Sequence, residues 1–176
     1  MDDYITDTGS TGEYKFLHDG TGGFIMAAVQ YGSNPNPNTT LAVAGNGGGG
    51  SSTTGFQLYY DDAAPENDAH RTLITASGGN VPINSTGANG TLPAATPLTH
   101  AFSYSVGDSP YDYRYWINGV ETGGKNDSVN PATGSASTSL YVGCGASAVR
   151  GSYLEGRIYA LVIFDRDWET PLIQYL

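Results

Sequence analysis

The chain has 176 residues with a formal net charge of −10, and only 7 of its residues are Lys or Arg. Nucleic acids and anionic membranes are bound through clustered cations that neutralise phosphates, so this composition argues against both as partners. The 25 Gly and 13 Tyr, set among short apolar runs, predict one all-β domain that spans residues 1–176.

Four candidate strands fall in the first half of the chain, each a short apolar or alternating run bounded by turn residues. Phe24–Tyr31 is apolar on both faces, which predicts a strand that is covered from both sides. The other three candidates are Glu13–His18, Phe56–Tyr60 and Arg71–Ala76.

Two long segments between these strands are predicted to be loops. Gly32–Gly55 contains alternating Asn and Pro followed by a run of Gly, and Ser77–Pro97 is rich in Gly, Asn and Pro. Loops of this length in a compact domain are usually functional or poorly ordered.

Four more strands are predicted in the second half, at Ala101–Val106, Tyr113–Ile117, Leu140–Cys144 and Arg157–Phe164. Asn118-Gly119 follows the second of them and predicts a tight hairpin, because both residue types tolerate a positive φ. The residues after Val120 would form the other arm of this hairpin.

The last long strand is apolar on both faces. Strict alternation divides its side chains into a core-facing set and an opposite set. The core-facing set is Ile158, Ala160, Val162 and Phe164, and the opposite set is Tyr159, Leu161 and Ile163. Either the segment that follows or a second subunit is expected to cover the opposite set. That segment contains Thr170 and Pro171, which predict a short C-terminal helical turn.

The predicted strands have no long amphipathic helix between them, which favours an antiparallel β-sandwich or jelly roll over a parallel sheet. Several motifs also resemble those of one known family, in the same order along the chain. They are His100–Tyr104, Tyr113–Val120, Leu140–Gly143, Leu154–Arg166 and Thr170–Leu176. The chain therefore resembles a laminin-G-like jelly-roll domain of the concanavalin-A-like superfamily. The resemblance implies a domain that presents a binding surface, but it does not identify the ligand.

The sequence contains no familiar catalytic motif. Relatives of this fold that cleave β-glucans use a Glu-x-Asp-x-x-Glu strand, which is absent, as are Gly-x-Ser-x-Gly and His-Glu-x-x-His. We therefore predict that the protein is not an enzyme. The alternative is a glycanase of unrecognised type, in which Asp61 or Glu66 would pair with Asp108 or Asp112.

An acidic cluster follows the strand that ends at Tyr60. Its carboxylates are Asp61, Asp62, Glu66 and Asp68. Calcium prefers such clustered oxygen ligands, so these residues are candidate calcium ligands, and no other cofactor is expected. A solvated surface turn has the same composition, and both interpretations stay open.

A second cluster combines aromatic rings with carboxylates. It consists of Asp108, Tyr111, Asp112, Tyr113 and Trp116. Sugars stack their C–H faces on aromatic rings and place their hydroxyls on polar side chains, so this cluster is a candidate glycan platform. Alternation separates Tyr113 from Trp116, and some of these rings are therefore expected in the core.

The single cysteine and the three histidines are expected to be structural. Cys144 shares a strand face with Leu140 and Val142, which predicts a buried, unreactive thiol. The histidines, at positions 18, 70 and 100, do not have the spacing of metal ligands.

The leading hypothesis from the sequence is a non-catalytic structural and binding protein on a virion surface, such as a phage capsid decoration, fibre or tail component. It rests on an extracellular type of fold in an acidic chain that begins without a signal-like segment. The expected partners are other virion proteins or further copies of the chain, together with a host surface glycan. The alternative is an extracellular carbohydrate-binding module of a secreted bacterial protein.

Overall fold

The computed structural model describes the chain in segments. These are residues 5–7, 9, 11–19, 21–32, 39–44, 54–61, 69–76, 80–89, 96–104, 111–127, 134–136, 138–144 and 154–165. In parts of several strands only the backbone path is described.

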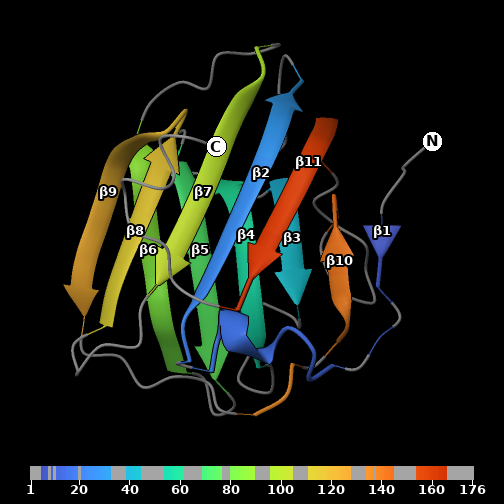
Figure 1. Ribbon diagram of the computed structural model, residues 1–176, viewed down its shortest axis with the longest axis vertical. Coiled ribbons are helices and arrows are strands. Elements are labelled where there is room, and N and C mark those ends of the chain that lie inside the picture. Colours follow the sequence, from blue (N-terminus) through green and yellow to red (C-terminus); the bar gives the residue numbers. More distant parts are fainter. Residues whose placement is uncertain are drawn as a thin grey trace.

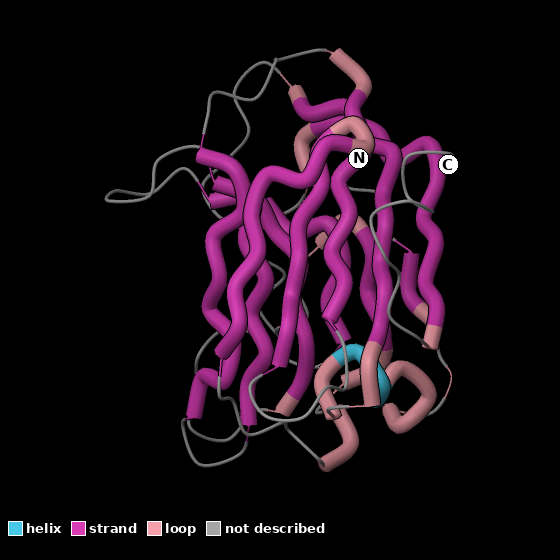
Figure 2. Tube along the Cα trace, turned by 60° about the vertical axis from the view of Figure 1, so that its left-hand side comes forward, coloured by secondary structure: helices cyan, strands magenta, loops and turns pink. Residues whose placement is uncertain are grey.

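The strands in these segments form two antiparallel sheets, which lie face to face (Figure 1). The six-stranded sheet has the order β1 (Ile5–Thr6), β10 (Leu140–Val142), β3 (Thr39–Ala44), β4 (Gly55–Asp61), β5 (Ala69–Ala76) and β6 (Asn80–Asn89). The five-stranded sheet has the order β11 (Gly156–Phe164), β2 (Gly23–Tyr31), β7 (Leu98–Tyr104), β8 (Tyr111–Ile117) and β9 (Val120–Asp127). Figure 2 shows the two layers from another side. The predicted all-β antiparallel sandwich of the jelly-roll class is therefore confirmed, while the predicted C-terminal turn lies outside the described residues.

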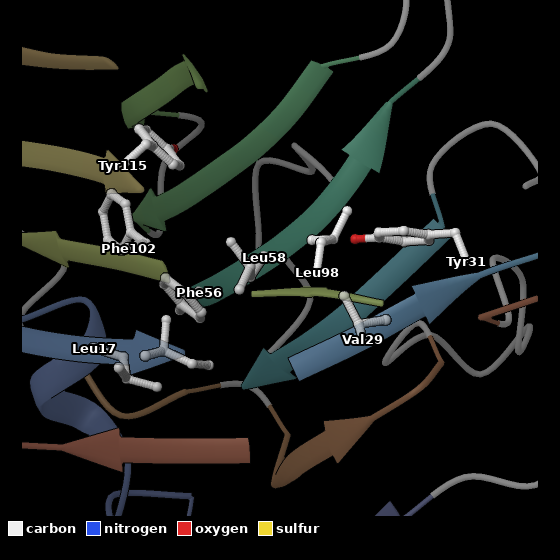
Figure 3. Packing of buried hydrophobic residues seen from close by; sticks show 9 residues of the cluster. Leu17, Val29, Tyr31, Phe56, Leu58, Leu98, Phe102 and Tyr115 are labelled. Atoms are coloured by element: carbon white, nitrogen blue, oxygen red, sulfur yellow. The ribbon is translucent and has the colours of Figure 1, made fainter. Parts of the chain in front are cut away.

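Side chains from both sheets meet in one hydrophobic core (Figure 3). Phe56 of β4 enters from the six-stranded sheet, and Phe102 of β7 and Tyr115 of β8 enter from the other. The ring centroid of Phe102 lies 5.0 Å from that of Tyr115 and 6.0 Å from that of Phe56, so tilted aromatic contacts link the two layers. A 3-10 turn, η1 (Lys15–Leu17), adds the buried Leu17 at one end of the core.

The predicted hairpin joins β8 to β9. Asn118 and Gly119 have φ values of 52° and 73°, and a positive φ at both positions is typical of the type I′ turn that suits twisted strand pairs. The turn is also bonded to the start of β7, because Asn118 donates its N–H to the Thr99 carbonyl at 2.9 Å. In return, Oδ1 of Asn118 accepts the Thr99 N–H at 3.0 Å. These two bonds fix the hairpin against its neighbouring strand.

A β-bulge interrupts the pairing of β11 with β2. Ile158 pairs with Val29 and Ala160 pairs with Ala28, so Tyr159 is an extra residue opposite no residue of β2. An extra residue reverses the alternation of side chains in the part of the strand that follows it.

The predicted faces of β11 are therefore wrong beyond the bulge. Leu161 and Ile163, predicted on the side away from the core, pack into it. Phe164, predicted in the core, instead joins a separate cluster on the face turned away from the core. The register places Ala160 and Val162 on that same face. The assignments of Ile158 to the core face and of Tyr159 to the opposite face are confirmed.

Three other segments also differ from the prediction. Glu13–His18, predicted as a strand, contains η1 instead. Both predicted loops contain a strand, β3 within Gly32–Gly55 and β6 within Ser77–Pro97. The sequence of β6 is mostly Asn, Ser, Thr and Gly, and this composition is typical of turns, so its pattern does not reveal a strand.

The predicted structural residues are buried. Cys144 is fully buried, and Leu140 and Val142 on the same strand face are 5% exposed. His18 and His100 are likewise fully buried, whereas the side chain of His70 lies outside the described part. In the portion of the chain that the structure covers, no helix is long and apolar enough to cross a membrane.

Candidate functional site

The residues predicted as a glycan platform are divided between two strand faces. Tyr111, Asp112 and Tyr113 lie in β8 and pair with β9, and only their backbone is described. The alternation of β8 is uninterrupted. Positions 112 and 116 therefore share one face of the strand, and positions 111 and 113 share the opposite face. Asp108 lies outside the described residues.

Trp116 is fully buried on the outer face of the five-stranded sheet, the face turned away from the six-stranded sheet. Phe24 and Ala101 are buried beside it, and Met26 and Phe164 pack against this cluster. The rings of Phe24 and Phe164 stack with their centroids 6.1 Å apart. Trp116 therefore contributes to packing within the chain, and its ring offers no exposed face to a ligand.

The predicted calcium cluster is described only at its first residue. Asp61 ends β4 and pairs with Ala69 of β5, while Asp62, Glu66 and Asp68 lie outside the described residues. Among the residues that the structure does describe, no group of three or more His, Cys, Asp or Glu side chains could hold a metal ion. Calcium binding at this loop stays a prediction.

An exposed patch on the outer face of the five-stranded sheet brings together an aromatic ring, an amide and a guanidinium. It lies where β2 ends and β11 begins, at the upper end of both strands in Figure 1. Tyr159 is 55% exposed, and its hydroxyl donates a hydrogen bond to Oε1 of Gln30 at 2.5 Å. Arg157 is exposed and lies directly opposite Gln30 in the register of the two strands. These three residues are referred to below as the bulge patch.

The position of Tyr159 follows from the bulge. Ile158 and Leu161 both pack into the core, so the two residues between them, Tyr159 and Ala160, are both directed outward. Both are exposed. Bulges commonly redirect a side chain near the edge of a sheet in this way.

Gly156 allows β11 to approach β2 closely just before the patch. It pairs with Tyr31, and a Cβ added to it would collide with the carbonyl oxygen of Gln30. Its φ of 158° also lies in a region that side-chain-bearing residues rarely adopt. Beside it, Gly32 donates its N–H to the Glu155 carbonyl at 2.5 Å and holds the two strand ends together.

Small side chains lie next to the bulge patch. Ala160 pairs with Ala28, and Ala28 pairs in turn with Thr99 of β7. The outer surface beside the Tyr159 ring is therefore formed by side chains too short to block a flat ligand.

The bulge patch has the chemistry of a binding surface. A fixed aromatic ring can stack on the C–H face of a sugar, and the amide and guanidinium can bond to its oxygens. The three side chains include neither a carboxylate nor a thiol, so the patch itself has no pair of carboxylic acids of the kind that most glycosidases use.

The sequence alone contains only a weak signal for this patch. Alternation correctly places Tyr159 opposite the core, but nothing in the chain indicates that Gln30, 129 positions away, would bond to it. The usable signal is that an Arg and a Tyr follow a Gly at the start of an otherwise apolar strand.

Two pKa values are shifted near η1. Tyr14 donates its hydroxyl to Oδ2 of Asp7 at 2.8 Å, and Oδ1 of Asp7 accepts the Gly9 N–H at 2.8 Å. The hydrogen bond to Asp7 is the main cause that raises the pKa of Tyr14 to about 12. The bonds from Gly9 and Tyr14 lower the pKa of Asp7. This pair connects the residues after β1 to the turn that precedes η1.

No protein-family model matches the chain, and no curated protein matches it either. Solved structures do match. The CBM40 module of the Ruminococcus gnavus IT-sialidase, bound to α2,3-sialyllactose, matches with a TM-score of 0.67 and 13% identity over 98% of this chain and 95% of the module. The NanB sialidase of Streptococcus pneumoniae matches all of this chain (100%) with a TM-score of 0.69 and 12% identity. A SAP-like pentraxin of Limulus polyphemus matches 90% of this chain and 70% of its own, with a TM-score of 0.61 and 9% identity.

These similarities show the fold. The chain shares a jelly-roll β-sandwich with a sialidase CBM40 module and a SAP-like pentraxin. It spans only 26% of the NanB sialidase chain but nearly the whole CBM40 module.

Proposed function

We propose that this chain is a non-catalytic, glycan-binding β-sandwich domain. The observation that carries the proposal is the extent of the match to the CBM40 module, which covers 98% of this chain and 95% of the module, and that module is bound to sialyllactose. Most of the NanB sialidase lies outside the match, so the similarity concerns one domain of that enzyme and not the whole.

The exposed chemistry of the described surface supports the same function. Tyr159 presents a large ring to solvent on a sheet face, with the polar groups of Gln30 and Arg157 beside it. Aromatic residues with an apolar body and a polar tip suit sugar binding, because the ring can stack on the C–H face of a pyranose while the polar tip forms hydrogen bonds.

The virion hypothesis from the sequence has less support. One reason for that hypothesis was an apolar face of the last strand, which a second subunit would cover. The bulge turns Leu161 and Ile163 into the core, and Phe164 stacks on Phe24. The need for a partner over this face is thereby removed, and glycan binding is the better supported function.

A glycan microarray tests the proposal. The purified chain is applied with and without calcium to sialylated, uronic-acid-containing and neutral glycans, and concentration-dependent binding to at least one class is expected. A folded chain that binds no glycan under either condition would refute the proposed function. Release of reducing sugar that disappears in Asp112→Asn would instead establish the glycanase alternative.

A further inference from the structure

We propose that the bulge patch is the glycan-binding site and that its ligand is a saccharide carrying a carboxylate group. The inference rests on the proposed function and adds a site and a ligand class to it. Its three groups come from two neighbouring strands and meet on one exposed surface, within the register that pairs Arg157 with Gln30.

The Tyr159 ring is a preorganised platform. Its backbone belongs to β11, and its hydroxyl is bonded to Gln30 of β2, so the ring is held at both ends and lies across the two strands. A ring fixed in this way loses little conformational entropy when a ligand stacks on it. It remains 55% exposed, which leaves surface for the C–H face of a pyranose ring.

Gly156 and the bulge together determine the shape of this surface. The glycine permits a strand approach that no other residue could adopt, and the bulge adds one residue whose outward side chain is Tyr159. Backbone features that are costly to maintain tend to gather at binding and active sites.

Arg157 determines the ligand class. Its side chain is exposed, and within the described residues no hydrogen bond or ion pair engages its guanidinium. A guanidinium binds a carboxylate through two parallel hydrogen bonds, which are stronger than bonds between neutral groups. One such cation beside a stacking ring suits a sugar with a single carboxylate, whereas polyanions require several cations.

The overall charge of the chain does not prevent this contact. The net charge of −10 repels anions at long range, and exposed Glu155 lies one residue before Gly156. At physiological ionic strength, charges beyond about 8 Å are largely screened, so the net charge of the chain opposes the contact with Arg157 only weakly, whereas Glu155 lies close enough to reduce its strength.

Isothermal titration calorimetry at physiological salt tests the inference with 3′-sialyllactose, and with lactose as the neutral probe. The wild-type chain is expected to bind 3′-sialyllactose and to bind lactose at least about tenfold more weakly, which corresponds to one charge-assisted contact. Arg157→Gln should lower the affinity for 3′-sialyllactose at least about tenfold while leaving lactose unchanged. Tyr159→Ala should weaken both ligands, and Tyr159→Phe should retain most of the stacking.

Lys15→Gln is the matched control, because it removes one positive charge in η1, outside the patch. It should leave both affinities unchanged, and the thermal unfolding midpoint of each variant reports that it is folded. If glycans bind but neither Arg157→Gln nor Tyr159→Ala reduces binding, the site is elsewhere and the proposed function still holds. If only Tyr159→Ala reduces binding and lactose binds as tightly as 3′-sialyllactose, recognition of the carboxylate by Arg157 is refuted. If no saccharide binds on the array or by calorimetry, the proposed function itself fails.

Discussion

At the scale of single residues, the pairing of Asp7 with Tyr14 shows how one hydrogen bond changes the protonation of both partners. The carboxylate of Asp7 accepts from both Tyr14 and Gly9, so the ionised acid and the neutral phenol stabilise each other. Each pKa therefore moves away from its ordinary value, downward for Asp7 and upward for Tyr14.

Asp7→Asn should return the pKa of Tyr14 from about 12 toward its ordinary value near 10. Because the folded state favours the protonated phenol, its contribution to stability is complete below the unfolded pKa and is lost as the pH rises through about 12. The contribution of Asp7, whose pKa is lowered, is instead present above its unfolded pKa and is lost as the pH falls through its folded value.

Ultraviolet difference titration of wild type against Asp7→Asn measures this effect, since tyrosinate absorbs at longer wavelength than tyrosine. One tyrosine should ionise at lower pH in the variant. Superimposable titration curves would show that the bond between Asp7 and Tyr14 does not form in solution.

At the scale of elements, the geometry of β11 depends on Gly156. Gly156→Ala would push a Cβ against the carbonyl oxygen of Gln30 and force a φ that alanine avoids. Strain of this kind costs on the order of 1–3 kcal/mol. Urea denaturation should therefore show a clear loss of stability in Gly156→Ala.

Gly134→Ala is the control for this substitution. A Cβ at Gly134 would have Thr54 as its nearest neighbour, at an ordinary van der Waals distance of 3.8 Å, and nearly unchanged stability is expected. Equal effects of the two substitutions would contradict the close approach of β11 to β2.

The strands were predictable from the sequence where local chemistry determines them. Asn118-Gly119 specifies its turn by the positive φ that both residues tolerate, and the apolar run of β2 specifies a strand covered on both faces. The faces of β11 were not predictable, because Tyr159 becomes a bulge only through its pairing with β2. The same limit applies to the site, since the bond from Tyr159 to Gln30 depends on the tertiary fold.

At the scale of the whole molecule, two of the three side chains that suggested a second subunit, Leu161 and Ile163, pack within the chain, while Tyr159 stays exposed. Phe24 and Trp116 are fully buried on the outer face, and Leu161 and Ile163 face the other sheet. Among the residues that the structure describes, the exposed large hydrophobic side chains are Val120 and Tyr159, which leaves little apolar surface there for self-association.

Light scattering coupled to size exclusion should therefore give the mass of a monomer, 18.4 kDa. A stable trimer or larger assembly would contradict this expectation and would return the virion hypothesis to the leading position. The measurement is best repeated with saturating 3′-sialyllactose. Binding at the proposed site should leave the chain a monomer.

The bulge in β11 has a consequence for solubility as well. Among the described strands, β11 is the last at one side of its sheet, so backbone groups along its outer edge could pair with the strand of a neighbouring molecule and begin aggregation. The extra residue breaks the regular spacing of those groups, which prevents a straight strand from aligning along the full edge. The residue that presents Tyr159 to solvent thus also protects the exposed edge of the sandwich from growing into a larger sheet.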